Sequence, residues 1–122
     1  MAVAATAAAV VTVPSSTRPA LVTSLGARIA AVGRLAWLGP VDRVRPPQPA
    51  GGRSNSAQRV RALFGAFLPT VEQHAHLRRL GDAAVLLVDD VVDTGWTAAL
   101  VARELRLAGA AAVLPFALAL DG

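Results

Sequence analysis

The sequence predicts an α/β domain with a mostly parallel sheet of about four to five strands flanked by helices. Strand–helix–strand patterns recur at both ends of the chain, and several apolar runs are continuous, which is typical of strands buried on both faces. The 122 residues are 54% hydrophobic and carry a formal net charge of +4, which excludes a disordered chain. Residues 1–122 are therefore expected to form a single domain, either as a complete protein or as a C-terminal fragment of a larger one.

The N-terminal third predicts a strand, a helix and a second strand. The apolar run Ala8–Val13 ends at a proline and predicts a buried strand. We expect Ser16–Thr17 to cap a helix with Pro19 in its first turn and its end at Gly33. The short apolar run Leu35–Leu38 predicts the next strand. The expected apolar face of the helix consists of Leu21, Val22, Leu25, Ile29 and Val32.

The middle of the chain is expected to be a long loop followed by short elements. Residues 39–56 lack apolar periodicity and are rich in proline, glycine and arginine, which predicts a flexible basic loop. A capping-box pattern at Asn55 predicts a short helix, and Gly65–Leu68 predicts a short strand. A second capping box, Thr70–Gln73, predicts a helix that continues to Leu80.

The C-terminal third gives the clearest pattern. The run Ala84–Val88 predicts a fully buried strand, and a helix is expected from Trp96 to Ala108. The last element, Ala112–Leu120, reads as another strand. Its Pro115 favours an edge position, because proline removes one donor from the hydrogen-bond ladder.

An acidic turn between this strand and helix carries the strongest functional signal. In the stretch VLLVDDVVDTGWT (85–97), Asp89 and Asp90 follow the buried strand, and a polar turn then opens the helix. In open α/β sheets ligands bind beyond the carboxyl ends of strands, and helix N-termini attract anions. The acidic pair suits vicinal hydroxyls and the turn suits a phosphate, so a sugar phosphate fits. The blander alternative is an ordinary helix cap after a solvated strand end. The donors of the turn would be the hydroxyls of Thr94 and Thr97 and the backbone at Gly95.

This stretch resembles the phosphoribosyl-pyrophosphate motif of type I phosphoribosyltransferases. The resemblance implies a Rossmann-like core in which Asp89 and Asp90 take the ribose 2′- and 3′-hydroxyls. It further implies that the turn, Asp93, Thr94, Gly95, Trp96 and Thr97, wraps the 5′-phosphate. By the same resemblance Asp93 is the candidate general base, and Mg²⁺ accompanies the pyrophosphate with Asp89 and Asp90 nearby. Trp96 is bulkier than the residue usual at its position.

A second resemblance covers more of the chain. The motifs RPPQ (45–48), QR (58–59) and GAF (65–67) resemble ComF-type competence proteins. Most of the chain also resembles the C-terminal domain of some bacterial RecQ-type DNA helicases. These likenesses imply a partner such as DNA or a helicase domain, and a role in DNA uptake, recombination or repair. A helicase motor is excluded here, because a chain without lysine has no Walker A loop.

Three readings therefore stay open: an active phosphoribosyltransferase, a related module that binds a nucleotide or DNA without turnover, or a nonfunctional truncated gene product. The pyrophosphate loop matches weakly, with Arg18 as its cation, and no hood over the nucleobase is recognisable. The sequence leaves the acceptor base and a homodimer open. The basic residues around the 39–56 loop suit pyrophosphate or a nucleic-acid backbone, or are simply solvated: Arg43, Arg45, Arg53, Arg59 and Arg61.

Composition also bears on where the protein works. The chain has no cysteine, so it has no disulfide framework and no thiolate metal site. Its longest nearly uncharged apolar stretch, residues 1–14, is shorter than the roughly 17–25 residues that span a bilayer. We therefore expect a cytoplasmic protein without a membrane partner.

Overall fold

The computed structural model describes residues 7–14, 18–44, 66–92 and 96–120. The elements, in chain order, are β1 (Ala7–Thr12), α1 (Pro19–Gly33), β2 (Ala36–Pro40), β3 (Asp42–Arg43), β4 (Phe67–Leu68), α3 (Val71–Leu77), β5 (Ala84–Val92), α4 (Trp96–Leu107) and β6 (Ala112–Leu120).

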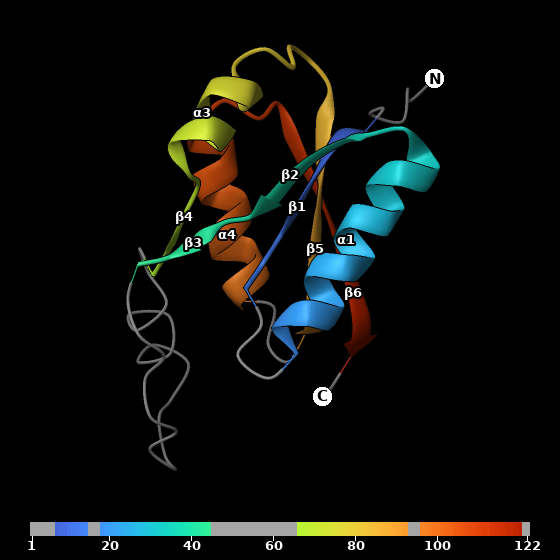
Figure 1. Cartoon of the computed structure of the whole chain (residues 1–122). Helices are drawn as coiled ribbons and strands as arrows, with labels where there is room; N and C mark the ends of the chain where they lie inside the picture. Colours follow the sequence, from blue (N-terminus) through green and yellow to red (C-terminus); the bar gives the residue numbers. More distant parts are fainter. Residues whose placement is uncertain (1–6, 15–17, 45–65, 93–95, 121–122) are drawn as a thin grey trace, which may run out of the picture.

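A four-stranded sheet with the order β2-β1-β5-β6 forms the centre of the fold, and all of its strand pairs are parallel. Helix α1 covers one face of this sheet, while α3 and α4 lie on the other (Figure 1). The short strands β3 and β4 pair antiparallel to form a separate two-stranded sheet. The predicted fold class is confirmed, and so is the edge position of β6, the strand that contains Pro115.

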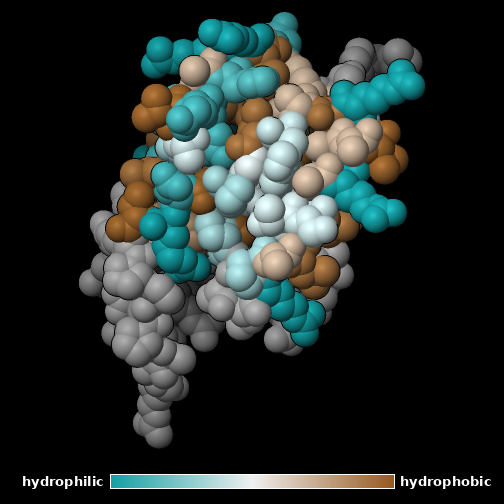
Figure 2. Space-filling view, in the orientation of Figure 1, coloured by the Kyte–Doolittle hydropathy of each residue, from teal (hydrophilic) through white to brown (hydrophobic). Residues whose placement is uncertain are grey.

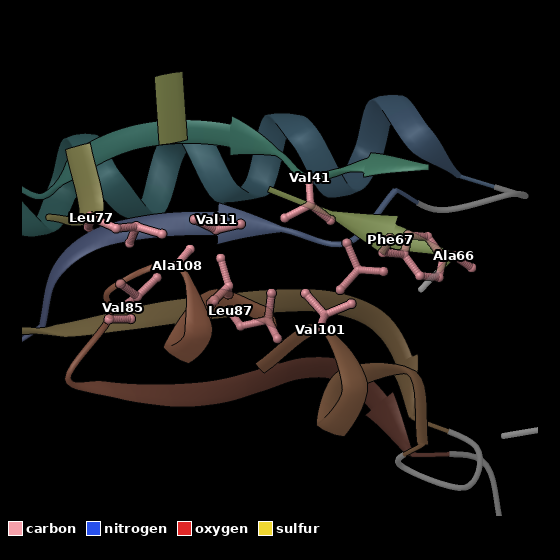
Figure 3. Packing of buried hydrophobic residues seen from close by; sticks show 13 residues of the cluster. Val11, Val41, Ala66, Phe67, Leu77, Val85, Leu87, Val101 and Ala108 are labelled. Atoms are coloured by element: carbon pink, nitrogen blue, oxygen red, sulfur yellow. The ribbon is translucent and has the colours of Figure 1, made fainter. Parts of the chain in front are cut away.

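The face of the sheet under α4 carries the larger hydrophobic core. Val101 of α4 packs in one cluster with Val11 of β1 and with Val85 and Leu87 of β5 (Figure 3). Leu105 of α4 belongs to the same cluster. Phe67 of β4 and Leu77 of α3 also belong to this cluster, so it joins residues of the main sheet, the small sheet and two helices. Because its members come from residues 9 to 113, it forms only when distant parts of the chain come together.

The face under α1 is thinner and depends on close approach. Its fully buried side chains are Val10, Val22, Ala30 and Val88. At Gly26 a Cβ atom would lie 2.5 Å from Cγ2 of Thr12 and 2.7 Å from the Trp37 ring. Such distances are too short for real contacts, so α1 lies this close to the sheet only because residue 26 is glycine. Trp37 is half-buried and packs against the same hydrophobic cluster.

The ends and faces of α1 differ in three ways from the prediction. The N-cap is Arg18 rather than Ser16–Thr17, and it makes no side-chain capping bond, while Pro19 starts the helix as expected. The helix does end at Gly33, but Arg34 adopts the left-handed conformation (φ 56°) and donates to the carbonyls that end the helix. Leu21 and Val32, both predicted on the apolar face, are 49% and 81% exposed, because the sheet contacts α1 along the line through residues 22, 26 and 30.

The region after β2 contains more structure than the loop predicted for residues 39–56. β2 continues to Pro40, and β3 follows at once because its two residues pair with β4. The remainder of that loop and the helix expected at Asn55 lie outside the described residues. Of the strand predicted at Gly65–Leu68, Phe67–Leu68 form β4, whereas Ala66 is in a turn and Gly65 lies outside the described residues. The Thr70 capping box is confirmed, but α3 ends at Leu77, before the predicted Leu80.

The C-terminal elements agree closely with the prediction, apart from the length of β5. This strand runs to Val92 rather than Val88, because β6 pairs with it in register as far as Leu120.

Among the described residues no helix is long and apolar enough to cross a membrane. On the face shown in Figure 2, hydrophobic residues are scattered and hydrophilic ones gather towards the upper end.

Candidate functional site

The candidate site lies where β1 and β5 approach their carboxyl ends, the edge at which parallel sheets bind ligands. The amide of Val13 donates to the carbonyl of Val88 (2.9 Å), so the end of β1 is fastened beside the residue that precedes Asp89. Helices α1 and α4 both begin at this edge, because each follows a strand that ends there (Figure 1). Two helix N-termini and two carboxylates therefore meet at one end of the sheet.

Asp89 is the buried carboxylate of the site. Its side chain follows Leu87 on the α4 face by strand alternation, and only 7% of the residue is exposed. The amide of Asp90 donates to Asp89 Oδ1 (2.8 Å). The pKa of Asp89 is raised from 3.8 to about 6, mainly by burial. The bond from the Asp90 amide lowers this pKa, whereas the hydrogen bond and charge of the Asp90 carboxyl raise it.

The pair differs from the prediction in one respect. The sequence suggested that Asp89 and Asp90 stand just beyond the strand, whereas both lie inside β5. Pairing with β6 extends the strand past them, with Asp89 opposite Ala117. The two carboxyls are consequently held by sheet backbone rather than by a loop. A carboxylate that is buried and close to a second one suits a ligand that brings hydroxyl donors or a cation.

The remaining residues of the predicted phosphate turn are only partly described. Thr97 lies in the first turn of α4 and is half-buried, and the backbone of Trp96 begins that helix. Asp93, Thr94 and Gly95 lie outside the described residues. α4 starts at Trp96, six residues after Asp90.

Of the arginines predicted to bind pyrophosphate or nucleic acid, two can be placed. Arg18 is the exposed N-cap of α1. Arg43 lies on β3, where its guanidinium stacks 4.5 Å from the centroid of the Phe67 ring and donates to the Pro14 carbonyl (3.5 Å). The structure does not describe Arg45, Arg53, Arg59 or Arg61.

The position of Arg43 brings a cation to the same edge as the acidic pair. Pro14 follows Val13, whose amide is bonded to the carbonyl that precedes Asp89. Stacking on Phe67 holds the guanidinium plane without neutralising its charge. The side chain is thus ordered in advance and keeps donors available for an anion.

Gln73 fixes the segment that leads to Arg43, a role that the sequence did not indicate. The sequence identified this residue as part of a capping box, and that bond is present: its amide accepts from the Thr70 backbone through Oε1 (2.9 Å). Its Nε2 group also donates to the carbonyls of Leu38, Gly39 and Pro40, at 3.0 to 3.1 Å. The Gln73 side chain is buried (1% exposed), so its polar atoms need partners within the protein. These bonds hold the backbone at the end of β2, just before β3 begins.

A magnesium ion fits this edge only together with a ligand. Among the described residues, no three His, Asp or Glu side chains gather to hold a metal. Mg²⁺ commonly keeps several waters and binds one or two carboxylates plus substrate phosphates. The adjacent carboxyls of Asp89 and Asp90, with their mutual repulsion, match that mode of binding. Bound with a pyrophosphate ligand, the ion would supply charge neutralisation.

Comparison with models of known protein families finds no match, and neither does a search of curated proteins. The function is therefore argued from the geometry of this edge together with the motif on β5.

Proposed function

We propose that the carboxyl edge of the sheet binds the ribose 5-phosphate part of phosphoribosyl pyrophosphate or a nucleotide, as in the type I phosphoribosyltransferases that the β5 motif resembles. The observation that carries this proposal is the Asp89–Asp90 pair inside β5, with Asp89 buried, a few residues before α4 begins at Trp96. The proposal places the protein in the cytoplasm, which suits a chain without cysteine.

The acidic pair is suited to recognising vicinal hydroxyls. Each carboxylate accepts hydrogen bonds but donates none when ionised, so two neighbouring sugar hydroxyls can satisfy both at once. Burial makes such bonds stronger than they are in water, because the competing solvent is largely excluded. The raised pKa of Asp89 means that burial disfavours its ionised form, and hydroxyl donors of a ligand would stabilise that form.

The phosphate end of the ligand is assigned to the start of α4. The segment 93–97 contains Thr94 and Thr97 and leads into α4, and hydroxyls and backbone amides at a helix N-terminus bind phosphate without a lysine. Arg43 supplies a stacked guanidinium at the same edge and is assigned to the pyrophosphate.

Calorimetric titration with phosphoribosyl pyrophosphate and Mg²⁺ tests binding. We expect saturable heat with the parent chain and at least tenfold weaker binding in the Asp89→Asn/Asp90→Asn variant. Asp82→Asn is the matched control, because this exposed acid lies just before the amino end of β5. Absence of heat with the parent, or equal heat in all three proteins, contradicts the proposal.

Turnover is a separate question with its own measurement. Release of pyrophosphate in the presence of adenine, guanine, hypoxanthine or uracil identifies a phosphoribosyltransferase, and in that case Asp93 is the candidate base. Binding without release identifies a non-catalytic module, the reading implied by the likeness to ComF and RecQ proteins. In that case we expect binding of single-stranded DNA that weakens steeply with salt.

A further inference from the structure

A bulge interrupts β2 just before the chain leaves the main sheet. Consecutive residues of β1 pair with Trp37 and Gly39, so Leu38 is an extra residue without a counterpart on β1. Gly39 has φ 82°, a conformation that favours glycine, and a Cβ atom there would meet nothing within 4 Å. A bulge bends its strand and can re-aim a side chain beside a functional site.

Gln73 holds this bulge from α3. The carbonyls of Leu38, Gly39 and Pro40 all accept from its Nε2 group, at 3.0 to 3.1 Å. Its Oε1 atom accepts from the Thr70 amide, so the carboxamide cannot turn over without losing both sets of bonds. A buried carboxamide whose polar atoms are all bonded fixes the backbone that it binds.

The segment after the bulge carries Arg43 to the carboxyl edge. The amide of Val41 donates to the Thr12 carbonyl (3.0 Å), and the Val41 side chain is buried in the larger core. Because side chains alternate along an extended segment, Arg43 projects to the same side as Val41, while Asp42 between them is exposed. On that side Arg43 meets the ring of Phe67, which belongs to the same core as Val41 (Figure 3).

The end of β1 lies between this cation and the acidic pair. In the strand order β2-β1-β5, Arg43 comes from the β2 side and bonds to Pro14 after β1, whereas Asp89 lies on the β5 side. Neither the carbonyl of Pro14 nor the ring of Phe67 neutralises the guanidinium, so its charge remains available to an anion. A ligand that meets both groups must therefore carry hydroxyls at one place and a second anionic group at another.

We propose that Gln73 is a positioning residue for the pyrophosphate group of the ligand. By holding the bulge of β2 it places the Arg43 guanidinium at the carboxyl edge, and this placement gives the site a preference for a pyrophosphate over a lone 5-phosphate. The inference rests on the proposed function, because the ribose 5-phosphate part must first bind at Asp89 and Asp90. Gln73 itself touches no ligand, since it is 1% exposed and its polar atoms are bonded within the protein.

Two ligands that differ only in the pyrophosphate test the proposal. Ribose 5-phosphate and phosphoribosyl pyrophosphate, each with Mg²⁺, are titrated by calorimetry into the parent, Gln73→Met and Arg43→Gln chains. We expect the parent to bind phosphoribosyl pyrophosphate at least tenfold more tightly than ribose 5-phosphate. In both variants this ratio should fall below about threefold, while the affinity for ribose 5-phosphate stays within about twofold of the parent. Glu72→Gln is the matched control, because this exposed residue precedes Gln73 on α3, and it should change neither affinity.

A readout without ligand measures the position of Arg43 directly. The Phe67 ring, 4.5 Å from the guanidinium carbon, should shift the NMR signals of the Arg43 side chain in the parent. In Gln73→Met this ring-current shift should shrink by at least half, and in Glu72→Gln it should stay unchanged. A purely structural role of Gln73 would lower the unfolding temperature but leave both this shift and the affinity ratio as they are.

Gly39→Ala disturbs the same bulge without altering Gln73, so the test does not depend on the folding of one variant. Alanine rarely adopts the positive φ of this position, and we expect the affinity ratio to fall at least threefold. A parent that does not bind ribose 5-phosphate would contradict the proposed function. If ribose 5-phosphate binds, an unchanged ratio in folded Gln73→Met or in Gly39→Ala would overturn this inference alone.

Discussion

The two faces of the sheet handle a buried polar side chain in opposite ways. On the α4 side, Gln73 is buried and every polar atom of its carboxamide is bonded, to Thr70 and to three carbonyls around β2. On the α1 side, Thr12 is equally buried, but its hydroxyl has no hydrogen-bond partner among the described residues. Gln73 holds α3 against the end of β2, whereas Thr12 is buried without a hydrogen bond where α1 packs closely on the sheet.

This difference extends to the candidate site. Asp89 follows the strand onto the thick α4 face, where core side chains exclude water and raise its pKa to about 6. The site thus takes its unusual acidity from the same packing that gives the fold its main core. The hydrophobic core stabilises the fold, whereas the charge of Asp89 at its end lowers the free energy of unfolding. Ligand binding can recover that loss.

The strongest test of the comparison is Gln73→Glu. A carboxylate in place of Nε2 turns acceptors towards three carbonyl oxygens, which we expect to destabilise the fold by about 3 kcal/mol. Gln73→Met, which removes the polar group at similar volume, should cost less. Urea unfolding of both variants measures this, and a Gln73→Met variant as stable as the parent would show that the bonds to β2 are unimportant.

Gly26→Ala tests the close packing on the other face. The added methyl group overlaps Thr12 and Trp37, and we expect a loss of about 2 kcal/mol. The double variant Gly26→Ala/Thr12→Ser removes one of the two overlapping groups and should recover part of this loss. Ser24→Ala on the exposed side of α1 is the control. A neutral Gly26→Ala would mean that α1 does not lie as close to β1 as the structure shows.

Asp89→Asn tests whether the acid costs stability. Because the pKa of Asp89 is raised in the folded protein, its proton stabilises the fold at low pH, and this contribution is lost as pH rises through about 6. At pH 7 the neutral amide should therefore stabilise the chain by about 1 to 2 kcal/mol, a value discounted for nearby solvent. The gain should vanish below pH 4. Urea unfolding between pH 4 and 8 measures it, and a pH-independent difference would contradict it.

Thr12→Val should give the smallest effect. Valine keeps the methyl group that contacts Gly26 and removes the hydroxyl that lacks a partner, so we expect a gain of about 1 kcal/mol. Thermal unfolding measures the change. Destabilisation instead would show that the hydroxyl is bonded in solution and that the two faces are alike in this respect.

The sequence predicted those parts of the fold that rest on local patterns. β1 and β6 are apolar runs, β5 begins with one, and the capping box at Thr70 predicts the start of α3, so these elements could be located without knowledge of their neighbours. β3 escaped prediction because its two residues, one acidic and one basic, become a strand only by pairing with a segment more than twenty residues away. The exposure of Val32 likewise depends on which line of α1 meets the sheet.

For the site, the motif located Asp89 and Asp90 but not their environment. Their place inside β5 depends on the length of β6, and the raised pKa depends on the core beneath them. Arg43 was anticipated as one basic residue of a loop, whereas its order comes from Phe67 on another strand. Local sequence therefore gave the chemistry of these residues, and tertiary pairing gave their positions.

Thermal unfolding of the parent and Asp89→Asn chains, at pH 7 with and without phosphoribosyl pyrophosphate and Mg²⁺, tests the central claim most directly. The ligand should raise the midpoint of the parent by mass action, and Asp82→Asn should respond in the same way. Asp89→Asn should unfold at a higher temperature without ligand and show no further rise with it. If the ligand stabilises Asp89→Asn as much as the parent, the acidic pair is not the binding site.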